Sequence, residues 1–533
     1  MANGTAGSST AGHEAQPQWR PKFNPWIVAL TVTLASFMEV LDTSIANVAL
    51  PHIAGGMSAS QDESTWVLTS YLVSNAIILP LSGWLSLLLG RKRFYMTCVA
   101  VFTLSSFACG IAPSLDLLVF FRVLQGIGGG GLQPSEQAIL ADTFLPRQRG
   151  MAFAVYGIAV VTAPAIGPTF GGWITDNFTW RWIFFINIPV GILSLFLTSF
   201  ILEDPPYFLK ERKEKLKSKL EIDYWGIIFV AIGLGFLQVV LDKGERDDWL
   251  ASNFIRGCIL ISFAGLVMAV YWELTRKNPV VDLTLLKDRN FGVSAFLMFM
   301  VGVILLGSTV LIPQYLQLVM GYTATQAGMA ISPGGLLVMC LLPVVGYMLG
   351  KVEARWMIAV GLAITSLALI HMTTFSTGMD FKDAVLARCF QAAGLAFLFV
   401  PINTAAYAFV PPNKNNAASG LINLARNIGG SVGISAVTTL LARRAQFHQL
   451  RLAENTNLLN PNFNQAVDSV THVFGPGSSG NGPYALLLRV LQRQANTLSY
   501  IDCFWVMGIA FAALIPLVFF MKRTKPGRTA AAH

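Results

Sequence analysis

The sequence predicts an all-α integral membrane protein, and three observations lead to this prediction. Hydrophobic residues fill 54% of the 533 positions and charged residues 12%, whereas charged residues are about a quarter of an ordinary soluble domain. Apolar stretches that reach the roughly 20 residues of a spanning helix recur along the whole chain. An arginine pattern inside such stretches also occurs twice, which predicts two related halves.

About fourteen spans are predicted, in two pseudosymmetric six-helix halves with two further helices inserted between them. Residues 1–24 form a predicted cytoplasmic tail, 25–202 the N-terminal half, 203–290 a basic loop with the two inserted helices, 291–522 the C-terminal half, and 523–533 a second tail. The predicted spans lie near 25–50, 64–89, 94–113, 115–141, 149–174, 180–202, 223–242, 252–274, 291–318, 325–349, 355–375, 383–410, 416–441 and 499–521.

The charged loops predict the orientation of these spans. Cytoplasmic loops carry an excess of Lys and Arg, and basic clusters such as Arg91-Lys92-Arg93 fall in every second loop, whereas the opposite short loops 51–63, 111–116 and 319–324 have none. Both termini are therefore expected in the cytoplasm, with a long loop at about 443–497 outside. The formal charge of +9 is explained by topology, so no nucleic-acid partner is expected.

Two arginines lie inside predicted spans, at Arg122 and Arg388, each followed three residues later by a glutamine. An arginine at the bilayer centre costs at least ~2.5 kcal/mol on insertion scales, so it needs a partner or a water-filled cavity. The pair therefore indicates a duplicated protein with a polar pathway inside it.

Several motifs resemble those of the major facilitator superfamily. The loop from Gly83 to Arg93 stands between the second and third spans, the run from Arg122 to Gly128 lies in the fourth, and Gly167-Pro168-Thr169-Phe170-Gly171-Gly172 in the fifth is similar to an antiporter motif. With the Leu41 to Pro51 run and fourteen spans, the chain resembles EmrB-type drug/proton antiporters. The resemblance implies the major facilitator fold and proton-coupled export.

The resemblance also assigns gating roles. Small residues let helices approach closely and Pro168 interrupts its helix, so the run in the fifth span is expected to seal the halves against proton leak. The cytoplasmic loop motif is expected to allow close approach without its usual salt bridge, because Leu87 and Leu88 replace the charged residues of the family pattern. The predicted antiporter motif comprises Gly157, Gly167, Pro168, Gly171 and Gly172, and the loop motif Gly83, Gly90 and Arg91.

Four residues are predicted to couple protons. Arg122 and Asp42 fall at similar depth towards the outside, with Glu39 near the middle and Glu136 towards the inside, on helices rising ~1.5 Å per residue. Arg122, Gln125, Gly129, Gln133 and Glu136 are predicted to form one polar stripe. A packing ion pair is the alternative for Asp42 and Arg122. The substrate pathway is predicted to include Gln125, Gln133, Asn47, Gln314 and Asn403, although interhelical hydrogen bonding explains such residues equally well.

The sequence thus predicts a transporter and not an enzyme: a proton-coupled exporter of hydrophobic or cationic toxic compounds in a bacterial inner membrane. Proton-linked uptake and a membrane sensor are the alternatives. No G-x-x-x-x-G-K-[ST] loop for ATP and no His/Cys metal spacing occurs, so no cofactor is expected beyond the coupling protons. The resemblance implies as partners a periplasmic membrane-fusion adaptor and an outer-membrane channel, with the 443–497 loop as docking element.

Overall fold

The computed structural model describes residues 21–145, 147–217, 223–276, 279–411, 414–454, 456–457, 460–474 and 482–523. Most of the predicted N-terminal tail, residues 524–533 of the C-terminal tail and residues 475–481 of the predicted external loop lie outside these ranges. The described residues form helices and connecting turns with no β-strand, which confirms the all-α prediction.

The predicted N-terminal half and the inserted segment are built from twelve α-helices, in chain order. They are α1 (Pro25–Gly56), α2 (Gln61–Ser64), α3 (Trp66–Leu89), α4 (Arg91–Gly110), α5 (Leu115–Gly129), α6 (Leu132–Thr143), α7 (Arg149–Asn177), α8 (Trp182–Phe185), α9 (Asn187–Ile201), α10 (Pro206–Lys217), α11 (Tyr224–Lys243) and α12 (Asn253–Thr275), with the short turn η1 (Trp249–Ala251) between the last two.

The remainder of the chain supplies seven more α-helices. They are α13 (Arg289–Gln314), α14 (Ala324–Met348), α15 (Ala354–Met372), α16 (Phe381–Ala406), α17 (Asn415–Ala453), α18 (Pro461–Phe474) and α19 (Gly482–Val518), with short segments η2 (Leu283–Lys287) before α13 and η3 (Tyr315–Val319) after it.

Fourteen spans can be traced through the described residues. Twelve helical segments are long and apolar enough to cross a membrane, and α7, bent by 45° near Pro164, makes a thirteenth. The fourteenth is α17, which carries four arginines, Arg426, Arg443, Arg444 and Arg451, and still lies along α13 and α19. The predicted span number and fold class are confirmed.

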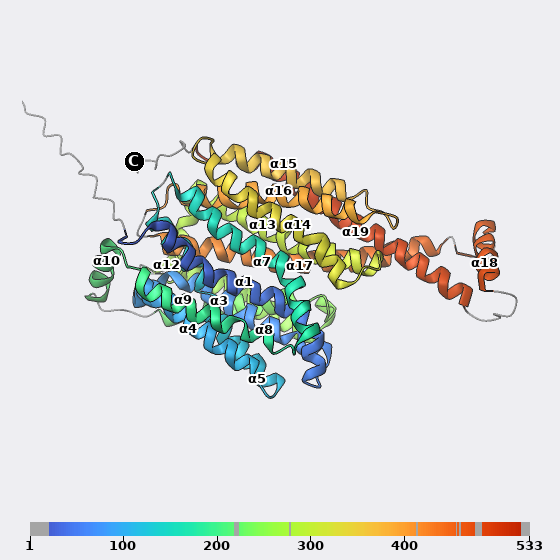
Figure 1. Cartoon of the computed structure of the whole chain (residues 1–533), viewed down its shortest axis with the longest axis horizontal. Helices are drawn as coiled ribbons and strands as arrows, with labels where there is room; N and C mark the ends of the chain where they lie inside the picture. The colour runs from blue at the N-terminus through green and yellow to red at the C-terminus, as the bar shows by residue number, and fades with distance from the viewer. Residues whose placement is uncertain are drawn as a thin grey trace, which may run out of the picture.

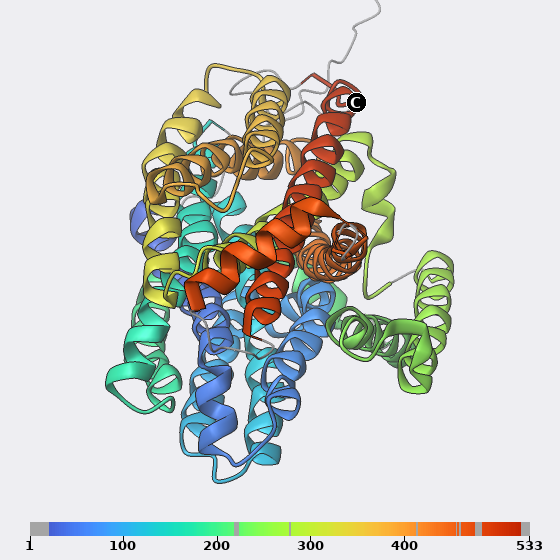
Figure 2. The ribbon, with the colours of Figure 1, turned by 90° about the vertical axis from the view of Figure 1, so that its right-hand side faces the viewer.

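Two helices join the halves. α7 lies against α1 on one side and α14 on the other, and α17 packs on α13 while also contacting α3 and α6 (Figure 1). The inserted helices α11 and α12 pack on each other at the edge of the bundle, where α11 contacts α3 and α17 (Figure 2). The inserted pair therefore stands outside the central seam.

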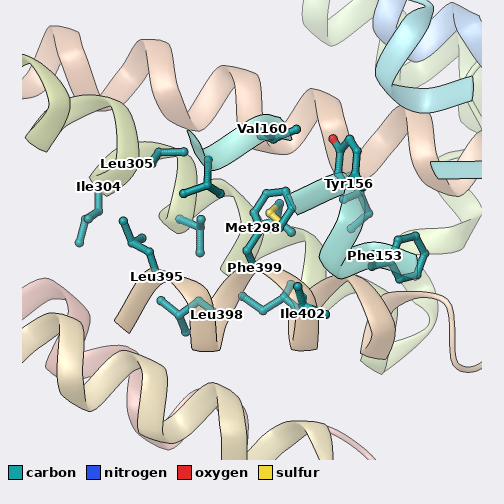
Figure 3. Packing of buried hydrophobic residues seen from close by; sticks show 14 of the residues in the cluster. Phe153, Tyr156, Val160, Met298, Ile304, Leu305, Leu395, Leu398, Phe399 and Ile402 are labelled. Atoms are coloured by element: carbon teal, nitrogen blue, oxygen red, sulfur yellow. The ribbon is translucent and has the colours of Figure 1, made fainter. Parts of the chain in front are cut away.

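The apolar core crosses from one half to the other beside this seam. Tyr156 of α7 and Met298 of α13 lie beside Phe399 of α16 (Figure 3), whereas the ring of Phe153 is turned away from them and stacks on Tyr407, with ring centroids 5.3 Å apart. The rings of Tyr156 and Phe399 have centroids 5.6 Å apart. Tyr156 is thus held in the apolar core by its ring while its hydroxyl remains available to polar neighbours.

The fourth span is packed closely and then interrupted. A Cβ added at Gly128 would lie 2.6 Å from the backbone nitrogen of Phe102, so only glycine permits this approach of α5 to α4. The helix breaks between Gly129 and Leu132, where α5 gives way to α6. The residues of the predicted polar stripe therefore lie on two consecutive helices of one span, with Arg122 and Gln125 on α5 and Gln133 and Glu136 on α6.

The predicted external stretch is mostly helical where it is described. α17 continues to Ala453, α19 begins at Gly482, and both extend beyond the bundle towards α18 (Figure 1). Arg444 Nε and His448 Nε2 lie 2.5 and 2.7 Å from Asp502 Oδ2 of α19, which fixes the two long helices to each other at the base of this extension.

Candidate functional site

A buried ion pair occupies the outer part of the N-terminal half. Arg122 of α5 donates from Nη1 to Asp42 Oδ2 of α1 over 2.6 Å, and both side chains are about 1% exposed or less. Gln125 donates to Asp42 Oδ1 at 3.1 Å, and Asn187 of α9 donates to the same oxygen at 2.7 Å. The sequence predicted that Asp42 and Arg122 lie at similar depth, and in the structure the two side chains are in contact. Their role in transport stays a prediction.

The guanidinium of Arg122 is held on its other sides as well. Nε donates to the backbone oxygen of Val67 at 2.9 Å, and the guanidinium lies 4.3 Å from the ring centroid of Tyr71 and 5.7 Å from that of Phe184. Ring faces attract cations most strongly where water is excluded. Arg122 therefore has one orientation, which points its charge at Asp42.

Glu39 forms the next cluster along α1. Its Oε1 accepts from the Tyr71 hydroxyl at 2.9 Å and from Asn75 Nδ2 at 3.3 Å, and its Oε2 accepts from Gln133 Nε2. The carboxylate is 4% exposed, and all three donors are neutral. Tyr71 thus touches both clusters, through its ring to Arg122 and through its hydroxyl to Glu39.

The C-terminal half reaches into this second cluster. Arg426 of α17, 6% exposed, donates from Nη2 to Gln133 Oε1 and from Nη1 to the Tyr156 hydroxyl at 3.0 Å. Tyr156 lies 3.1 Å from both Gln133 Oε1 and Asn423 Oδ1. The middle cluster is therefore shared by α1, α3, α6, α7 and α17, across the boundary between the halves.

Glu136 of α6 makes a third, separate acidic position. Its Oε1 accepts from Thr33 of α1 at 2.5 Å, and the side chain is fully buried. Thr33, which binds Glu136, and Asp42 are nine residues apart on α1. At ~1.5 Å per residue, the positions of Glu136 and Asp42 along this helix are therefore roughly 14 Å apart. That distance is about half of the ~30 Å hydrocarbon thickness of a bilayer.

The predicted pathway residues divide into two groups. Gln125 and Gln133 lie in the buried clusters described above. Asn403 is buried but donates to Phe399 O of its own helix at 2.9 Å, while Asn47 is exposed on α1 and Gln314 is half-buried at the end of α13. The structure does not bring these last three residues to the acidic clusters.

The loop motif from Gly83 to Arg93 forms a salt bridge, which the sequence had not led us to expect. Arg91 pairs with Asp142 at the end of α6, and both side chains are 2% exposed. Asn415 of α17 donates to Asp142 Oδ1 at 2.7 Å, and Asn416 donates to Ser86 at 3.2 Å. The expectation was wrong because the acid comes from α6 and not from position 87 of the loop.

The two glycines of this loop have different roles. A Cβ at Gly83 would lie 3.1 Å from the backbone of Ala417, so Gly83 permits the close approach of α3 to α17. Gly90 has φ +91° and links α3 to α4 in a conformation that favours glycine. Gly83 therefore lets the loop lie against the start of α17, whereas a Cβ at Gly90 would face Asp204 Oδ2 at 3.3 Å.

The predicted antiporter run lies on the face of α7 towards α1. A Cβ at Gly167 would approach Ser44 to 2.2 Å, and one at Gly171 would approach Ile45 to 2.9 Å, whereas Gly172 has open space. Gly157 faces Phe399 and Leu342 of the other half at 3.1 and 3.2 Å. Pro168 lies inside α7 next to Gly167. Close packing against α1 thus requires glycine at Gly167 and Gly171, whereas Gly172 has room for a larger side chain.

The second arginine of the repeat lacks an acid. Arg388 of α16 donates to Gln391 Oε1 at 2.6 Å and to Ser308 Oγ at 3.4 Å, both neutral groups. The halves are therefore alike in fold and unequal in charge. Among the described residues, no group of three His, Cys, Asp or Glu side chains is placed to hold a metal ion.

Sequence reasoning missed several residues of these clusters, among them Arg426, Tyr71, Tyr156, Asn75 and Asp142. Arg426 could have been identified from the sequence, because an arginine inside a spanning helix needs a polar or acidic partner, as Arg122 does. Tyr156 and Asn75 are ordinary helix residues whose importance depends on which helices meet. Nothing in the sequence linked Asn187 to Asp42, with which it bonds in the structure.

Comparisons with known proteins agree with this architecture. The family model described as Major Facilitator Superfamily matches residues 32–434. The chain is 36% identical over 497 residues to the multidrug export protein EmrB of Escherichia coli (strain K12), covering 93% of this chain and 95% of that one. It is also 36% identical over 495 residues to the fatty acid resistance protein FarB of Neisseria gonorrhoeae, covering 93% and 96%.

A solved structure shares the fold at low sequence identity. The proton:xylose symporter XylE bound to 6-bromo-6-deoxy-D-glucose aligns with a TM-score of 0.61 at 15% identity, covering 95% of this chain and 97% of that chain. At this identity the likeness concerns the arrangement of the helices alone.

The Arg91–Asp142 pair leads to a stability prediction. Arg91→Met leaves a buried carboxylate without its cation and is expected to cost about 3–5 kcal/mol, whereas the double variant Arg91→Met/Asp142→Leu should recover most of that loss. Thermal unfolding of the detergent-solubilised protein measures both. If the double variant is as unstable as Arg91→Met alone, the charge on Asp142 is not the cause.

The control is Lys414→Met, which removes a pair that is partly exposed. Lys414 Nζ lies 2.6 Å from Asp282 Oδ2, with the lysine 40% exposed, so its loss should cost about 1 kcal/mol or less. Partial burial raises the pKa of Asp282, but hydrogen bonds from Lys414 and Thr284 outweigh this effect and leave the pKa below its usual value. The control pair is therefore ionised at neutral pH.

Proposed function

The chain belongs to the Major Facilitator Superfamily, and we propose that it exports hydrophobic or cationic toxic compounds across a bacterial inner membrane in exchange for protons. The similarity to multidrug export relatives over 93% of the chain supports export of drugs as the direction and class of transport. The observation that carries the proton coupling is the row of buried acids along α1, with Asp42 paired to Arg122.

The buried acids suit proton exchange for a physical reason. A carboxylate away from water depends on its few neighbours, so a change in access or in hydrogen bonding changes whether it holds a proton. Asp42, Glu39 and Glu136 occupy three depths on the α1 side of the N-terminal half. A proton that enters from one side and leaves to the other can drive a substrate in the opposite direction.

Export is favoured over proton-linked uptake by the α7 packing. The run from Gly167 to Gly172 resembles the antiporter motif, and Gly167 and Gly171 hold α7 tightly against α1. We propose that this contact keeps protons from leaking between the halves while substrate crosses. Protons are the only coupling species proposed, with no bound cofactor.

The orientation follows from the basic segments. The basic α10, the Arg91 loop and the start of α17 share one end of the bundle (Figure 1), and we place that end, with both termini, in the cytoplasm. The extension formed by α18 and the ends of α17 and α19 then projects into the periplasm. We propose that it meets a membrane-fusion adaptor, which connects the pump to an outer-membrane channel.

The first test is Asp42→Asn. This variant is expected to abolish proton-gradient-driven drug transport in proteoliposomes, a loss of at least about tenfold in rate, while drug binding to the detergent-solubilised protein remains measurable. The loss follows because an amide cannot exchange a proton. Gradient-driven transport at the rate of the unmodified protein would show that Asp42 carries no coupling proton.

The second test separates the two neighbouring glycines of the α7 run. Gly171→Leu should slow transport strongly because its side chain meets Ile45, whereas Gly172→Leu, which has open space, should have a much smaller effect. Both variants should insert in the membrane in equal amounts, as measured by immunoblotting. Equal transport rates in the two variants would rule out packing against α1 as the reason for the motif.

The third test addresses the projecting extension. Leu450 and Leu488 are 70% and 49% exposed on its surface. Leu450→Asp/Leu488→Asp should reduce co-purification with a co-expressed membrane-fusion adaptor while leaving transport in proteoliposomes unchanged. Leu250→Asp, at a 68% exposed leucine outside the extension, is the control and should leave co-purification intact. If only Leu250→Asp lost co-purification, the adaptor would bind near Leu250 and not at the extension.

A further inference from the structure

Arg426 belongs to a row of residues on α17 that bind the N-terminal half, and Asn427 beside it donates to Asn75 Oδ1 of α3 at 3.2 Å. From the start of the helix, Asn415 bonds to Asp142, Asn416 to Ser86 and Asn423 to Gln137, the last over 2.9 Å. These bonds connect the halves from the end that bears the basic segments to the middle of the bundle. Arg426 is the charged member of the row.

Arg426 has no acidic partner in direct contact among the residues that the structure describes. It donates to Gln133 Oε1 and to the Tyr156 hydroxyl, and its guanidinium lies 5.9 Å from the ring centroid of Phe399. A buried guanidinium that binds only neutral groups is costly unless a negative charge stands near it. Glu39 supplies that charge on the far side of the Gln133 amide.

The Gln133 amide can satisfy both neighbours in one orientation only. Nε2 is a donor and faces Glu39, while Oε1 is an acceptor and faces Arg426. A protonated Glu39 needs an acceptor for its new O–H, yet its neighbours Tyr71, Asn75 and Gln133 all present donors. If Gln133 turns to offer its oxygen to Glu39, it presents its NH₂ group to the guanidinium of Arg426.

We propose that Arg426 is a proton-controlled tether between the halves. While Glu39 is ionised, Gln133 holds the guanidinium in the N-terminal half and the cytoplasmic ends stay together. When Glu39 takes up a proton, the amide turns, Arg426 leaves, and the cytoplasmic ends separate. This inference rests on the proposed proton-coupled export and adds the residue that connects protonation to movement.

Other charged and titratable groups surround Glu39, and the test must separate them. Asp42 is on the same helix, Tyr71 on α3, Arg122 on α5, Glu136 on α6, Tyr156 on α7 and Arg426 on α17. Of these, Tyr156 and Arg426 bind the oxygen of Gln133. Removing a different acid should therefore leave the tether sensitive to pH.

The experiment measures the distance between the cytoplasmic ends in the full-length protein. Spin labels are attached to Arg93→Cys and Lys351→Cys, two exposed positions in different halves, in a background with the native cysteines replaced. Pulsed electron spin resonance in nanodiscs records the distance distribution at mildly alkaline and acidic pH. Without further changes, acidification is expected to shift the distribution to longer distances.

The variants give distinct expectations. Arg426→Gln and Glu39→Gln should each lose the pH-dependent shift and show the longer distance at every pH, and combining them should add nothing. Glu136→Gln should keep the shift. Arg388→Gln is the matched control, because Arg388 binds only residues of its own half, and it should keep the shift in full.

Three outcomes overturn the proposal or part of its basis. If Arg426→Gln keeps the full pH-dependent shift in distance, Arg426 is not the tether. If Arg388→Gln loses the shift to the same extent as Arg426→Gln, the effect is not specific to Arg426 and the proposal also fails. If the protein without these changes shows neither a shift nor gradient-driven transport, the proposed function fails together with the tether. Arg426→Lys replaces Arg426→Gln if the latter does not fold. Lysine keeps the positive charge but cannot donate from two guanidinium nitrogens at once, so this variant should show a smaller pH-dependent shift.

Discussion

The need to keep charge paired in an apolar bundle determines how the N-terminal half is built. Arg122 is 0% exposed, and an uncompensated guanidinium there costs several kcal/mol. Asp42, Gln125, the backbone of Val67 and the ring of Tyr71 hold it in place, and its Nη2 alone makes no hydrogen bond to the described residues. Those partners come from α1, α3 and α5, so one ion pair sets the mutual position of three helices. The glycines of α5 then follow, because Gly126 and Gly129 lie against α3 and Gly128 against α4, where no larger side chain fits.

The same constraint makes the two halves unequal. Arg388 repeats the position of Arg122 but binds Gln391 and Ser308, with no acid beside it. The acids lie on α1 and α6, and the cation that complements Glu39 comes from the other half, on α17. Pseudosymmetry thus describes the backbone, whereas the charges form one network across the seam. A proton in such a network affects the contact between the halves and not just one half.

Sequence reasoning was reliable where a single segment carries the information. Span length and the depth of Asp42 relative to Arg122 each follow from local counting along one or two helices, whereas the orientation inferred from loop charge stays a prediction. It failed where the partner comes from a distant segment: Asp142 for Arg91, and Arg426 for the Gln133 amide. The break at Gly130 and Gly131 was also missed, because consecutive glycines fit both a closely packed helix and an interrupted one. The roles of these residues in transport stay predictions.

α17, one of the two helices that join the halves, is less apolar than the other spans because it carries many polar residues. Several of these bond to helices of the N-terminal half. Bonds among amides, hydroxyls and a guanidinium in such a seam are each worth about 1–2 kcal/mol or less, because separated groups find other partners or water. An apolar seam of the same area would hold the halves together too firmly to rock. A polar seam can be broken and remade by a change of one charge, which is the property that an alternating-access transporter requires.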